Sequence, residues 1–368
     1  MAVLAPDDRV LVLRNTIGPD GVSWIEDVHP ESLEERRRSP DLALGPFWPG
    51  GTAVLADGAV VVVQGCWAHR LDPDLAVERS RRLPIDAPYN SFVVLADGSL
   101  ATKDLQRPAA TVSTLLVLDP VTLEDRAAPH PLPEACVARL SADGDELAVV
   151  GVSALHRPRW DPSAGAVVDR PELTQPYLVH EHQSFGWDPV VEAGAIWWLD
   201  NGDHTFEQRL TMLEQGVAAG PVRLWRAPAD GGEPASVEVC GLPGGAVTNP
   251  PLIDADRRIA LGYDSANGVL AAFGTDDLRP RWRRALRTAQ HLVLFPDTGE
   301  VLLDDHDPTT GDALVVLDIA DGTVHARVPV ESPAQSVVFG APGTRRDAYF
   351  VSLSTIARVE FDDGPGAS

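Results

Sequence analysis

A short hairpin pattern recurs along the whole chain and restricts the fold more than any other feature. The stretch PYNSFVVLADGSLATKD (88–104) has a polar entry, an apolar run, an Ala-Asp-Gly turn and a second apolar run. Two short runs rich in Val, Leu and Ile joined by Asp-Gly predict a β-hairpin. Such hairpins start near residues 52, 91, 136, 184, 248, 290 and 336. Most lie about 40–50 residues apart, which is a repeat period typical of propellers.

A second hairpin follows the first in several units, as in TLLVLDPVTLEDRAAP (114–129) and ALVVLDIADGTVHARVPV (313–330). Four strands per unit, repeated seven times, predict an all-β, seven-bladed β-propeller of four-stranded antiparallel blades. The N-terminal segment 9–38 carries strands outside the seven hairpins. We expect these strands to complete the last blade and close the ring, which removes a sheet edge. The whole chain, 1–368, is then one domain.

The LADG hairpins and the runs LLVLDPVTLE and LVVLDIADG resemble the repeats of the quinoprotein-like and YVTN-type seven-bladed propellers. The resemblance covers nearly the whole chain and concerns its architecture. The Gly-His and Trp-Asp pairs that mark WD40 blades are missing. Because many unrelated functions share this fold, the resemblance implies an architecture and no particular activity.

Charge and cysteine content narrow the classes of partner and compartment. A net charge of −24 disfavours nucleic acids and anionic membranes, since both are polyanions. The sequence shows no signal peptide and no long apolar span, so we expect a cytoplasmic protein without a membrane segment. Cys66, Cys136 and Cys240 are odd in number and widely spaced. They predict small buried side chains rather than disulfides or a metal site.

The repeat predicts where a site should lie. In each hairpin the start of the first strand and the end of the second meet at one face of the propeller. These strand ends are polar in most units, and the longer loops fall on the same face, which is typical of a binding surface. We expect a small-molecule ligand to contact the following residues there: Tyr89, Asn90, Gln183, Asn249, Asp264, Gln290, His291, Asp305, His306 and Gln335.

Five residues at this face are candidates for catalysis: Lys103, Asp104, His182, Asp200 and His204. Lys103 is the only lysine; the other basic residues are arginines. Its amine suits a Schiff base, a general base or an anion-binding group, and the alternative is a structural ion pair with Asp104. Histidine beside a carboxylate suits acid–base chemistry.

A metal site is a weaker prediction. Asp200, Asp203 and His204 are the candidate ligands, but no HExxH-type spacing supports them. Asn and Asp oxygens around an axis suit a divalent cation such as Ca²⁺. Lactonase-type propellers use a similar Glu/Asn/Asp set for a catalytic calcium ion. Those propellers have six blades, and no matching glutamate stands near the first blade here.

The sequence therefore predicts a small-molecule-binding propeller, with hydrolase or lyase chemistry of the acid–base or cation-assisted kind at the channel mouth. The alternative is a non-catalytic propeller that acts as a scaffold for protein partners or as a ligand sensor. Fold alone does not separate these functions.

Overall fold

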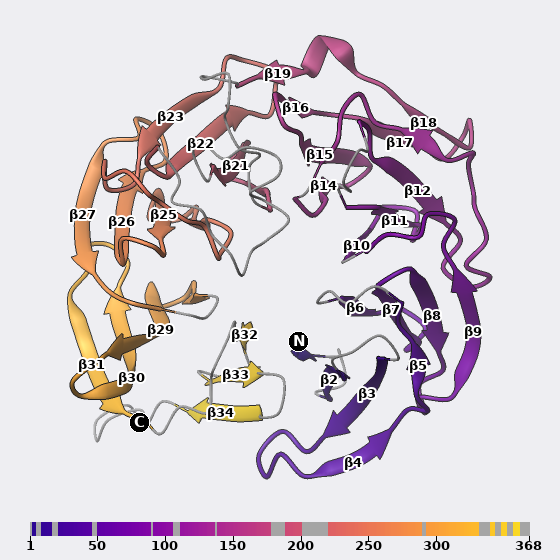
Figure 1. Cartoon of the computed structure of the whole chain (residues 1–368), viewed down its shortest axis with the longest axis horizontal. Helices are drawn as coiled ribbons and strands as arrows, with labels where there is room; N and C mark the ends of the chain where they lie inside the picture. Colours follow the sequence, from indigo (N-terminus) through magenta and orange to yellow (C-terminus); the bar gives the residue numbers. More distant parts are fainter. Residues whose placement is uncertain are drawn as a thin grey trace.

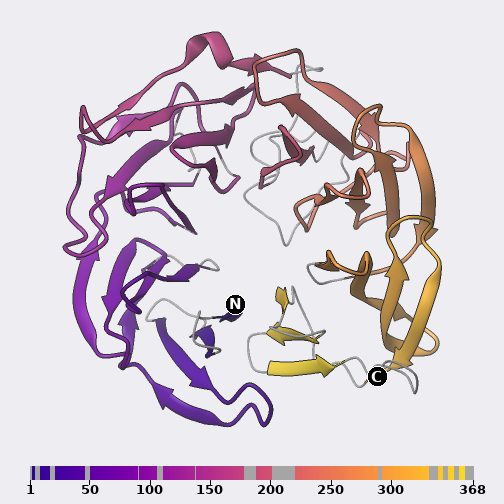
Figure 2. The same cartoon turned by 180° about the vertical axis from the view of Figure 1, so that it is seen from behind.

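The chain forms a ring of antiparallel sheets around a central axis (Figures 1 and 2). The computed structural model describes residues 2–4, 9–16, 21–45, 50–89, 91–105, 111–136, 138–177, 188–200, 220–288, 292–330, 339–342, 347–351 and 356–360. Within these ranges the strands form eight sheets, which we call blades 1 to 8 in chain order. The predicted β-propeller with four-stranded antiparallel blades is confirmed.

Blades 1 to 3 occupy the N-terminal third of the chain. Blade 1 contains β1 (Ala2–Leu4), β2 (Val10–Asn15), β3 (Val22–Val28) and β4 (Glu35–Arg38), with β5 (Leu42–Ala43) paired to β3. Blade 2 contains β6 (Gly51–Val54), β7 (Val60–Gln64), β8 (Trp67–Leu71) and β9 (Val77–Arg82). Blade 3 contains β10 (Phe92–Val94), β11 (Leu100–Lys103), β12 (Thr114–Leu118) and β13 (His130–Pro131).

Blade 4 has split outer strands. It contains β14 (Ser141–Asp143), β15 (Glu146–Val150), β16 (Ala154–His156), β17 (Arg159–Asp161), β18 (Ala166–Val168) and β19 (Gln175–Pro176). Both β16 and β17 pair with β15, so the chain between them interrupts a single third strand. The outer position is shared by β18 and β19, which are separated by the short helix η1 (Pro171–Leu173). No helix in the described ranges is long and apolar enough to cross a membrane.

Blades 5 to 8 complete the ring. Blade 5 contains β20 (Val190–Glu192), β21 (Ala195–Asp200), β22 (Arg223–Pro228) and β23 (Ala235–Glu238). Blade 6 contains β24 (Leu252–Asp254), β25 (Ile259–Asp264), β26 (Val269–Gly274) and β27 (Pro280–Ala285). Blade 7 contains β28 (Val293–Phe295), β29 (Glu300–Asp307), β30 (Gly311–Asp318) and β31 (Val324–Pro329). Blade 8 contains β32 (Phe339–Pro342), β33 (Asp347–Val351) and β34 (Ile356–Glu360).

The ring closes differently from the sequence prediction. The strands of segment 9–38 pair with β1 in a sheet of their own and do not pair with β32–β34, so the described strands make eight blades rather than seven. β1 is only three residues long, which is why it gives no readable hairpin in the sequence. Blades 1 and 8 instead meet face to face: Val10, Val12 and Val28 pack against Tyr349 and Val351.

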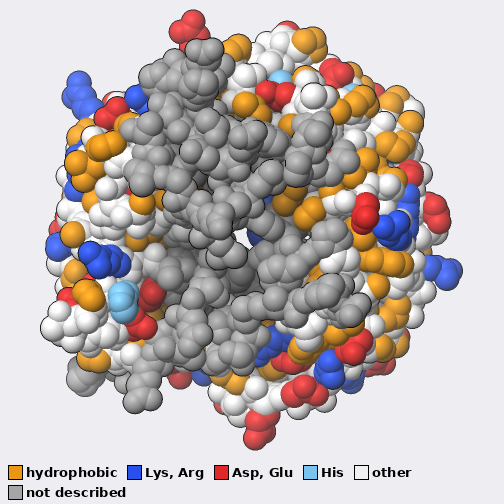
Figure 3. All heavy atoms as spheres, viewed as in Figure 1, with side chains coloured by type: hydrophobic (Ala, Val, Ile, Leu, Met, Phe, Trp, Pro, Cys, Tyr) orange, Lys and Arg blue, Asp and Glu red, His pale blue; other side chains and the backbone are white. Residues whose placement is uncertain are grey.

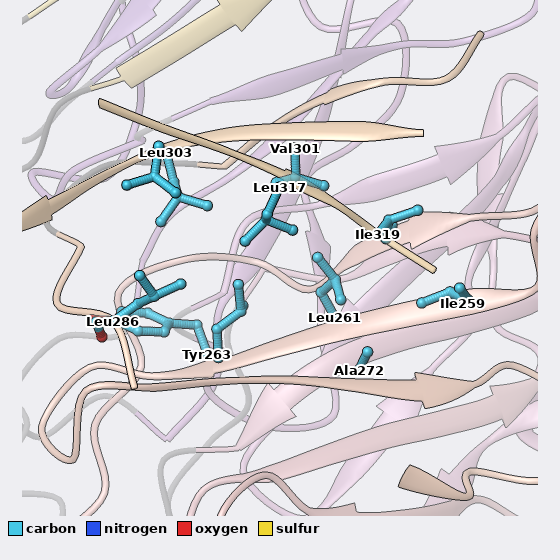
Figure 4. Packing of buried hydrophobic residues seen from close by; sticks show 11 residues of the cluster. Ile259, Leu261, Tyr263, Ala272, Leu286, Val301, Leu303, Leu317 and Ile319 are labelled. Carbon is cyan, nitrogen blue, oxygen red and sulfur yellow. The ribbon is translucent and has the colours of Figure 1, made fainter. Parts of the chain in front are cut away.

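The second strands of several blades are buried along their whole length because neighbouring blades cover both of their faces. All six residues of β21 and of β25 are buried. Between blades 6 and 7, Leu261 and Tyr263 of β25 pack against Val301 and Leu303 of β29 (Figure 4). This two-sided burial explains why these strands read as continuous Val, Leu and Ile runs rather than as an alternating pattern.

Several blades contain a leucine in the left-handed conformation whose side chain packs against the preceding blade. Leu33, Leu75, Leu123 and Leu278 have φ between 52° and 68° in the turn before the outermost strand. This conformation costs a non-glycine residue roughly 1–2 kcal/mol. Leu123 is fully buried and packs against Val61 and Val63 of blade 2. Burying the side chain against the preceding blade offsets the strain, since full burial of a leucine contributes about 1.5–3 kcal/mol.

Arginine is concentrated on the outermost strands. β4 contains Arg36, Arg37 and Arg38, β9 contains Arg79, Arg81 and Arg82, and β27 contains Arg281, Arg283 and Arg284. Basic side chains are visible at several points of the described perimeter (Figure 3). Charged side chains on an exposed edge strand oppose pairing with a strand from another molecule. The arginines of the outermost strands thus oppose edge-to-edge pairing with other molecules.

The left-handed leucine provides a test of blade packing. We expect Leu123→Ala to lower the free energy of unfolding by about 2–5 kcal/mol, because it leaves a cavity between blades 2 and 3. Val121→Ala is the matched control in the same turn, where the side chain is 56% exposed. Its effect should stay within about 0.5 kcal/mol. Urea denaturation followed by circular dichroism measures both, and equal losses would contradict the fastening role.

Candidate functional site

The hairpin register places the polar strand ends as expected. Phe92 pairs with Thr102 in blade 3, so Lys103 and Asp104 follow at the end where β10 begins. Among the described candidates, Lys103, Asp104, Asp200 and Asp264 lie at the ends of second strands. Tyr89 and Asn249 lie in the connections that precede β10 and β24. All six side chains are buried.

Two further candidates, Asp305 and His306, lie within β29 near its end. His306 is largely exposed and its Nδ1 lies 2.5 Å from Asp312 Oδ1 of β30. The remaining candidates fall outside the described residues: Asn90, His182, Gln183, Asp203, His204, Gln290, His291 and Gln335. Their roles therefore stay predictions.

Lys103 has an unusual environment for a lysine. Its side chain lies on the same side of β11 as Ala101, facing blade 4, and is only 2% exposed. Nζ donates a hydrogen bond of 2.9 Å to the carbonyl oxygen of Cys136, in the connection between blades 3 and 4. Among the described residues it has no other hydrogen-bond partner and no ion-pair partner. The ion pair between Lys103 and Asp104, which was the alternative interpretation of the sequence, is therefore not formed in the structure.

Burial of the Lys103 side chain favours loss of its ammonium proton. Burial lowers the pKa of Lys103, because a charged amine is poorly solvated in the protein interior. The negative charges of Asp104 and Asp188 act in the opposite direction and do not cancel the effect. Burial also raises the pKa of the Cys136 thiol to about 12, so that thiol is neutral at pH 7. We call Lys103, Asp104, Cys136, Asp188 and Arg139 the Lys103 cluster.

Further hydrogen bonds hold the residues of this cluster in place. Ser113 Oγ donates to the Cys136 carbonyl at 3.3 Å and accepts from the Cys136 amide at 3.0 Å. Asp104 Oδ1 accepts a hydrogen bond of 2.5 Å from the Thr114 amide. Arg139 donates its backbone N–H to Asp188 Oδ1 at 2.6 Å and pairs with the same carboxylate through Nε. The Lys103 amine is therefore influenced by Asp104 and Cys136 of the blade 3 region and by Asp188 ahead of blade 5.

Aspartates at other strand ends hold the chain's own backbone. Asp264 Oδ1 accepts from the Ala246 and Asn267 amides, each at 3.2 Å, and Oδ2 accepts from Asn267 Nδ2 at 2.8 Å. Asp305 Oδ1 accepts from the Arg287 amide at 2.8 Å. Each carboxylate thus fixes the connection that leads to or leaves its blade, which is a structural role.

Sequence reasoning missed a carboxylate of the same face. Glu134 Oε1 accepts from Ala154 N at 3.0 Å and from His156 Nε2 at 2.7 Å. Its Oε2 accepts from the amide and the hydroxyl of Ser153. A side chain on Gly151 would occupy the space of this carboxylate. The only signals of this network in the sequence are the charged Glu134 close to the apolar Cys136 and the glycine at position 151.

No group of three or more His, Cys, Asp or Glu side chains within the described ranges is arranged to hold a metal ion. Asp200 is buried at the end of β21, while the other two proposed ligands are outside those ranges. The sequence prediction for the cysteines holds for Cys66 and Cys136, which are buried free thiols, and Cys240 is partly buried.

Comparison with known proteins assigns the class. No family model matches the chain, and no curated protein matches it. Similar solved structures include the β-propeller domain of Swd1 (Cps50) from Myceliophteria thermophila, at 12% identity over 98% of this chain and 96% of that one, with a TM-score of 0.54. The chain is therefore a β-propeller.

Two further solved structures share the fold at similar distance. Sqt1 from Chaetomium thermophilum is 11% identical over 93% of this chain and 87% of that one, with a TM-score of 0.58. A streptogramin B lyase is 11% identical over 95% of this chain and 96% of that one, with a TM-score of 0.53. Identities this low show a shared fold alone.

The Glu134 network provides a pH-dependent test. Burial favours a higher pKa for Glu134, but the hydrogen bonds from His156 and Ser153 outweigh it and the pKa lies below the ordinary 4.5. The ionised carboxylate therefore stabilises the fold above pH 4.5, and this contribution is lost as the pH falls through the folded pKa.

We expect Glu134→Gln to cost about 1–3 kcal/mol at pH 7, because backbone and side-chain donors lose a charged acceptor. The difference from the wild-type protein should shrink below pH 4.5. Urea denaturation at several pH values measures it, with the exposed Glu31→Gln as control. A difference that is constant between pH 7 and pH 3.5 would show that the Glu134 charge does not matter.

Asp264 tests whether a strand-end aspartate is structural. We expect Asp264→Ala to destabilise the protein by about 1–3 kcal/mol, because the buried Ala246 amide loses its acceptor. Asp264→Asn keeps an acceptor oxygen and should recover part of the loss. Thermal and urea unfolding without any added ligand measure both variants. Unchanged stability in both would point to a ligand-binding role instead.

Proposed function

We propose that the chain is a small-molecule-binding β-propeller whose site is the Lys103 cluster, and that the Lys103 amine accepts a proton in hydrolase- or lyase-type chemistry. One observation carries this proposal. The only lysine of the chain is buried, and among the described residues no carboxylate forms an ion pair with it.

The free-energy cost of burying a lysine without an ion pair supports a functional role for Lys103. A buried charge without an ion pair is strongly disfavoured, and a lysine relieves the cost by losing its proton. An amine that has lost its proton can act as a base, and Lys103 lies at the end of β11, beside the start of β10. Asp104 and Asp188 favour the ammonium that forms when the amine accepts a proton. The cluster therefore combines a base with charges that stabilise its conjugate acid.

The second candidate is a non-catalytic propeller that acts as a scaffold or a ligand sensor. A specific observation favours it: Asp264 and Asp305, expected in the site, already accept hydrogen bonds from the chain's own backbone. In this case Lys103 is also structural and ties β11 to the connection that contains Cys136. A divalent cation such as Ca²⁺ is compatible with both candidate functions and is tested as a ligand for each.

Two substitutions of Lys103 separate these functions. Lys103→Met removes the amine, while Lys103→Arg keeps a positive charge that does not lose its proton. We screen carboxylates, lactones, aldehydes, ketones, CaCl₂ and MgCl₂ by thermal shift, and measure turnover of each compound that binds. We expect at least one organic compound to stabilise the wild-type protein and not Lys103→Met. Turnover, where present, should fall at least about 100-fold in both variants.

Val121→Ala, at an exposed turn, is the control and should respond as the wild-type protein does. If every compound that stabilises the wild-type protein stabilises Lys103→Met equally, Lys103 is not in the site. If no compound in the screen shifts the wild-type protein, the scaffold function is favoured.

A further inference from the structure

We propose that Lys103 forms a covalent imine with a small aldehyde or ketone, so that the ligand of the Lys103 cluster is a carbonyl compound. The inference rests on the proposed function, because it uses the same amine. It adds the chemical class of the ligand and the bond that it makes.

The hydrogen bonding of Nζ carries the first step of the argument. Its one described partner is the Cys136 carbonyl oxygen, which accepts an N–H and supplies no proton. Ser113 Oγ bonds both the carbonyl and the amide of Cys136 and fixes that connection, so the carbonyl holds the amine at a defined position. The other valences of the nitrogen have no partner among the described residues. An amine held by one donor bond keeps its lone pair available for a carbonyl carbon.

The charges around the amine suit an iminium product. Asp104 directly follows Lys103, the last residue of β11, and Asp188 lies ahead of β20. Both favour a positive charge on the nitrogen without forming an ion pair with it. Arg139, ahead of β14, pairs with Asp188. Cys136 contributes a neutral thiol and Ser113 a hydroxyl, so no other described group of the cluster competes as the nucleophile.

The apolar surroundings protect the product. The stem of Lys103 lies on the blade 3–4 interface that Ala101, Leu115, Leu140 and Leu147 form with Cys136. A desolvated amine has a lowered pKa, which raises the fraction of the neutral form that attacks a carbonyl. Excluding water from the interface also slows hydrolysis of the imine.

The reaction balances without an oxidant or a metal ion. Lys103 first releases its ammonium proton, and neutral Nζ adds to the carbonyl carbon. A C–N bond forms as the C=O π bond breaks, and one N–H proton passes to the oxygen to give a neutral carbinolamine. The released proton then returns to the hydroxyl, the C–O bond breaks, and the oxygen leaves as water. In total one ammonium and one carbonyl give one iminium and one water, with no change in oxidation state.

The composition makes the test direct, because Lys103 is the only side-chain amine. The folded wild-type protein is incubated at pH 7 with pyruvate, glyoxylate or butanal and sodium cyanoborohydride, which reduces an imine to a stable secondary amine. Trypsin does not cleave after an alkylated lysine, so the adduct keeps residues 83–103 and 104–126 in one peptide. Mass spectrometry of this peptide measures the labelled fraction.

We expect saturable labelling with at least one carbonyl compound, about tenfold or more above that of the same lysine in urea-unfolded protein. A tenfold gain is what each unit of pKa lowering gives to the neutral amine fraction. Lys103→Arg removes the side-chain label, and the N-terminal amine provides an internal reference in every sample. Labelling of the folded protein no greater than that of the unfolded protein overturns the imine.

The outcomes separate this inference from the function on which it rests. If a ligand stabilises the wild-type protein and not Lys103→Met, yet no carbonyl probe labels Lys103, the site stands and the imine is wrong. If neither binding nor labelling depends on Lys103, both are wrong. Labelling together with Lys103-dependent binding of the same carbonyl compound supports both.

Discussion

Contact between neighbouring blades is the constraint on which the rest of the structure depends. A single four-stranded sheet with two apolar faces is not stable alone, so each blade requires a neighbour on either side. The chain meets this requirement with continuous apolar strands and with a repeated leucine in the left-handed conformation. A residue type that disfavours positive φ is retained there because its side chain reaches the preceding blade. Packing between blades thus offsets the backbone strain at these leucines.

The same requirement explains the polar character of one face. The connections between blades leave backbone N–H groups that no strand can satisfy, and buried N–H groups need acceptors. Asp264 and Asp305 provide them for the connections that lead to blades 6 and 7. Asp104 and Glu134 accept from backbone N–H groups within blades 3 and 4. Polar residues at equivalent positions of a repeat therefore arise first from the geometry of the ring. A ligand site must be recognised as a departure from this rule.

Lys103 is such a departure. The aspartates are acceptors matched by donors, whereas the lysine amine is a donor matched by one neutral carbonyl. If the amine kept its proton, its burial would leave a charge without the compensation that the other strand-end residues have. This mismatch distinguishes it from the structural set that shares its position in the repeat.

The sequence predicts most of the fold because turn and strand signals coincide in every unit. In GGTAVLADGAVVVVQG the Asp-Gly turn and the valine run define β6 and β7. The additional blade is not predictable in the same way, since β1 has three residues and its partners are separated from it by sequence without a hairpin signal. The site is only partly predictable. The predicted strand ends indicate where Lys103 and Asp104 lie. They do not indicate that a carboxylate such as that of Asp264 already accepts hydrogen bonds from backbone N–H groups.

The distribution of basic residues gives the last argument about the site. Arginine stays protonated, forms ion pairs in two directions and suits exposed edge strands, where Arg37, Arg81 and Arg82 each pair with an aspartate. Lysine differs from arginine chiefly in that its pKa can be lowered into the neutral range by burial. A chain in which every other basic residue is arginine has its one lysine at a buried strand end, without an ion pair among the described residues. That is the position where the difference between the two side chains has the largest chemical consequence.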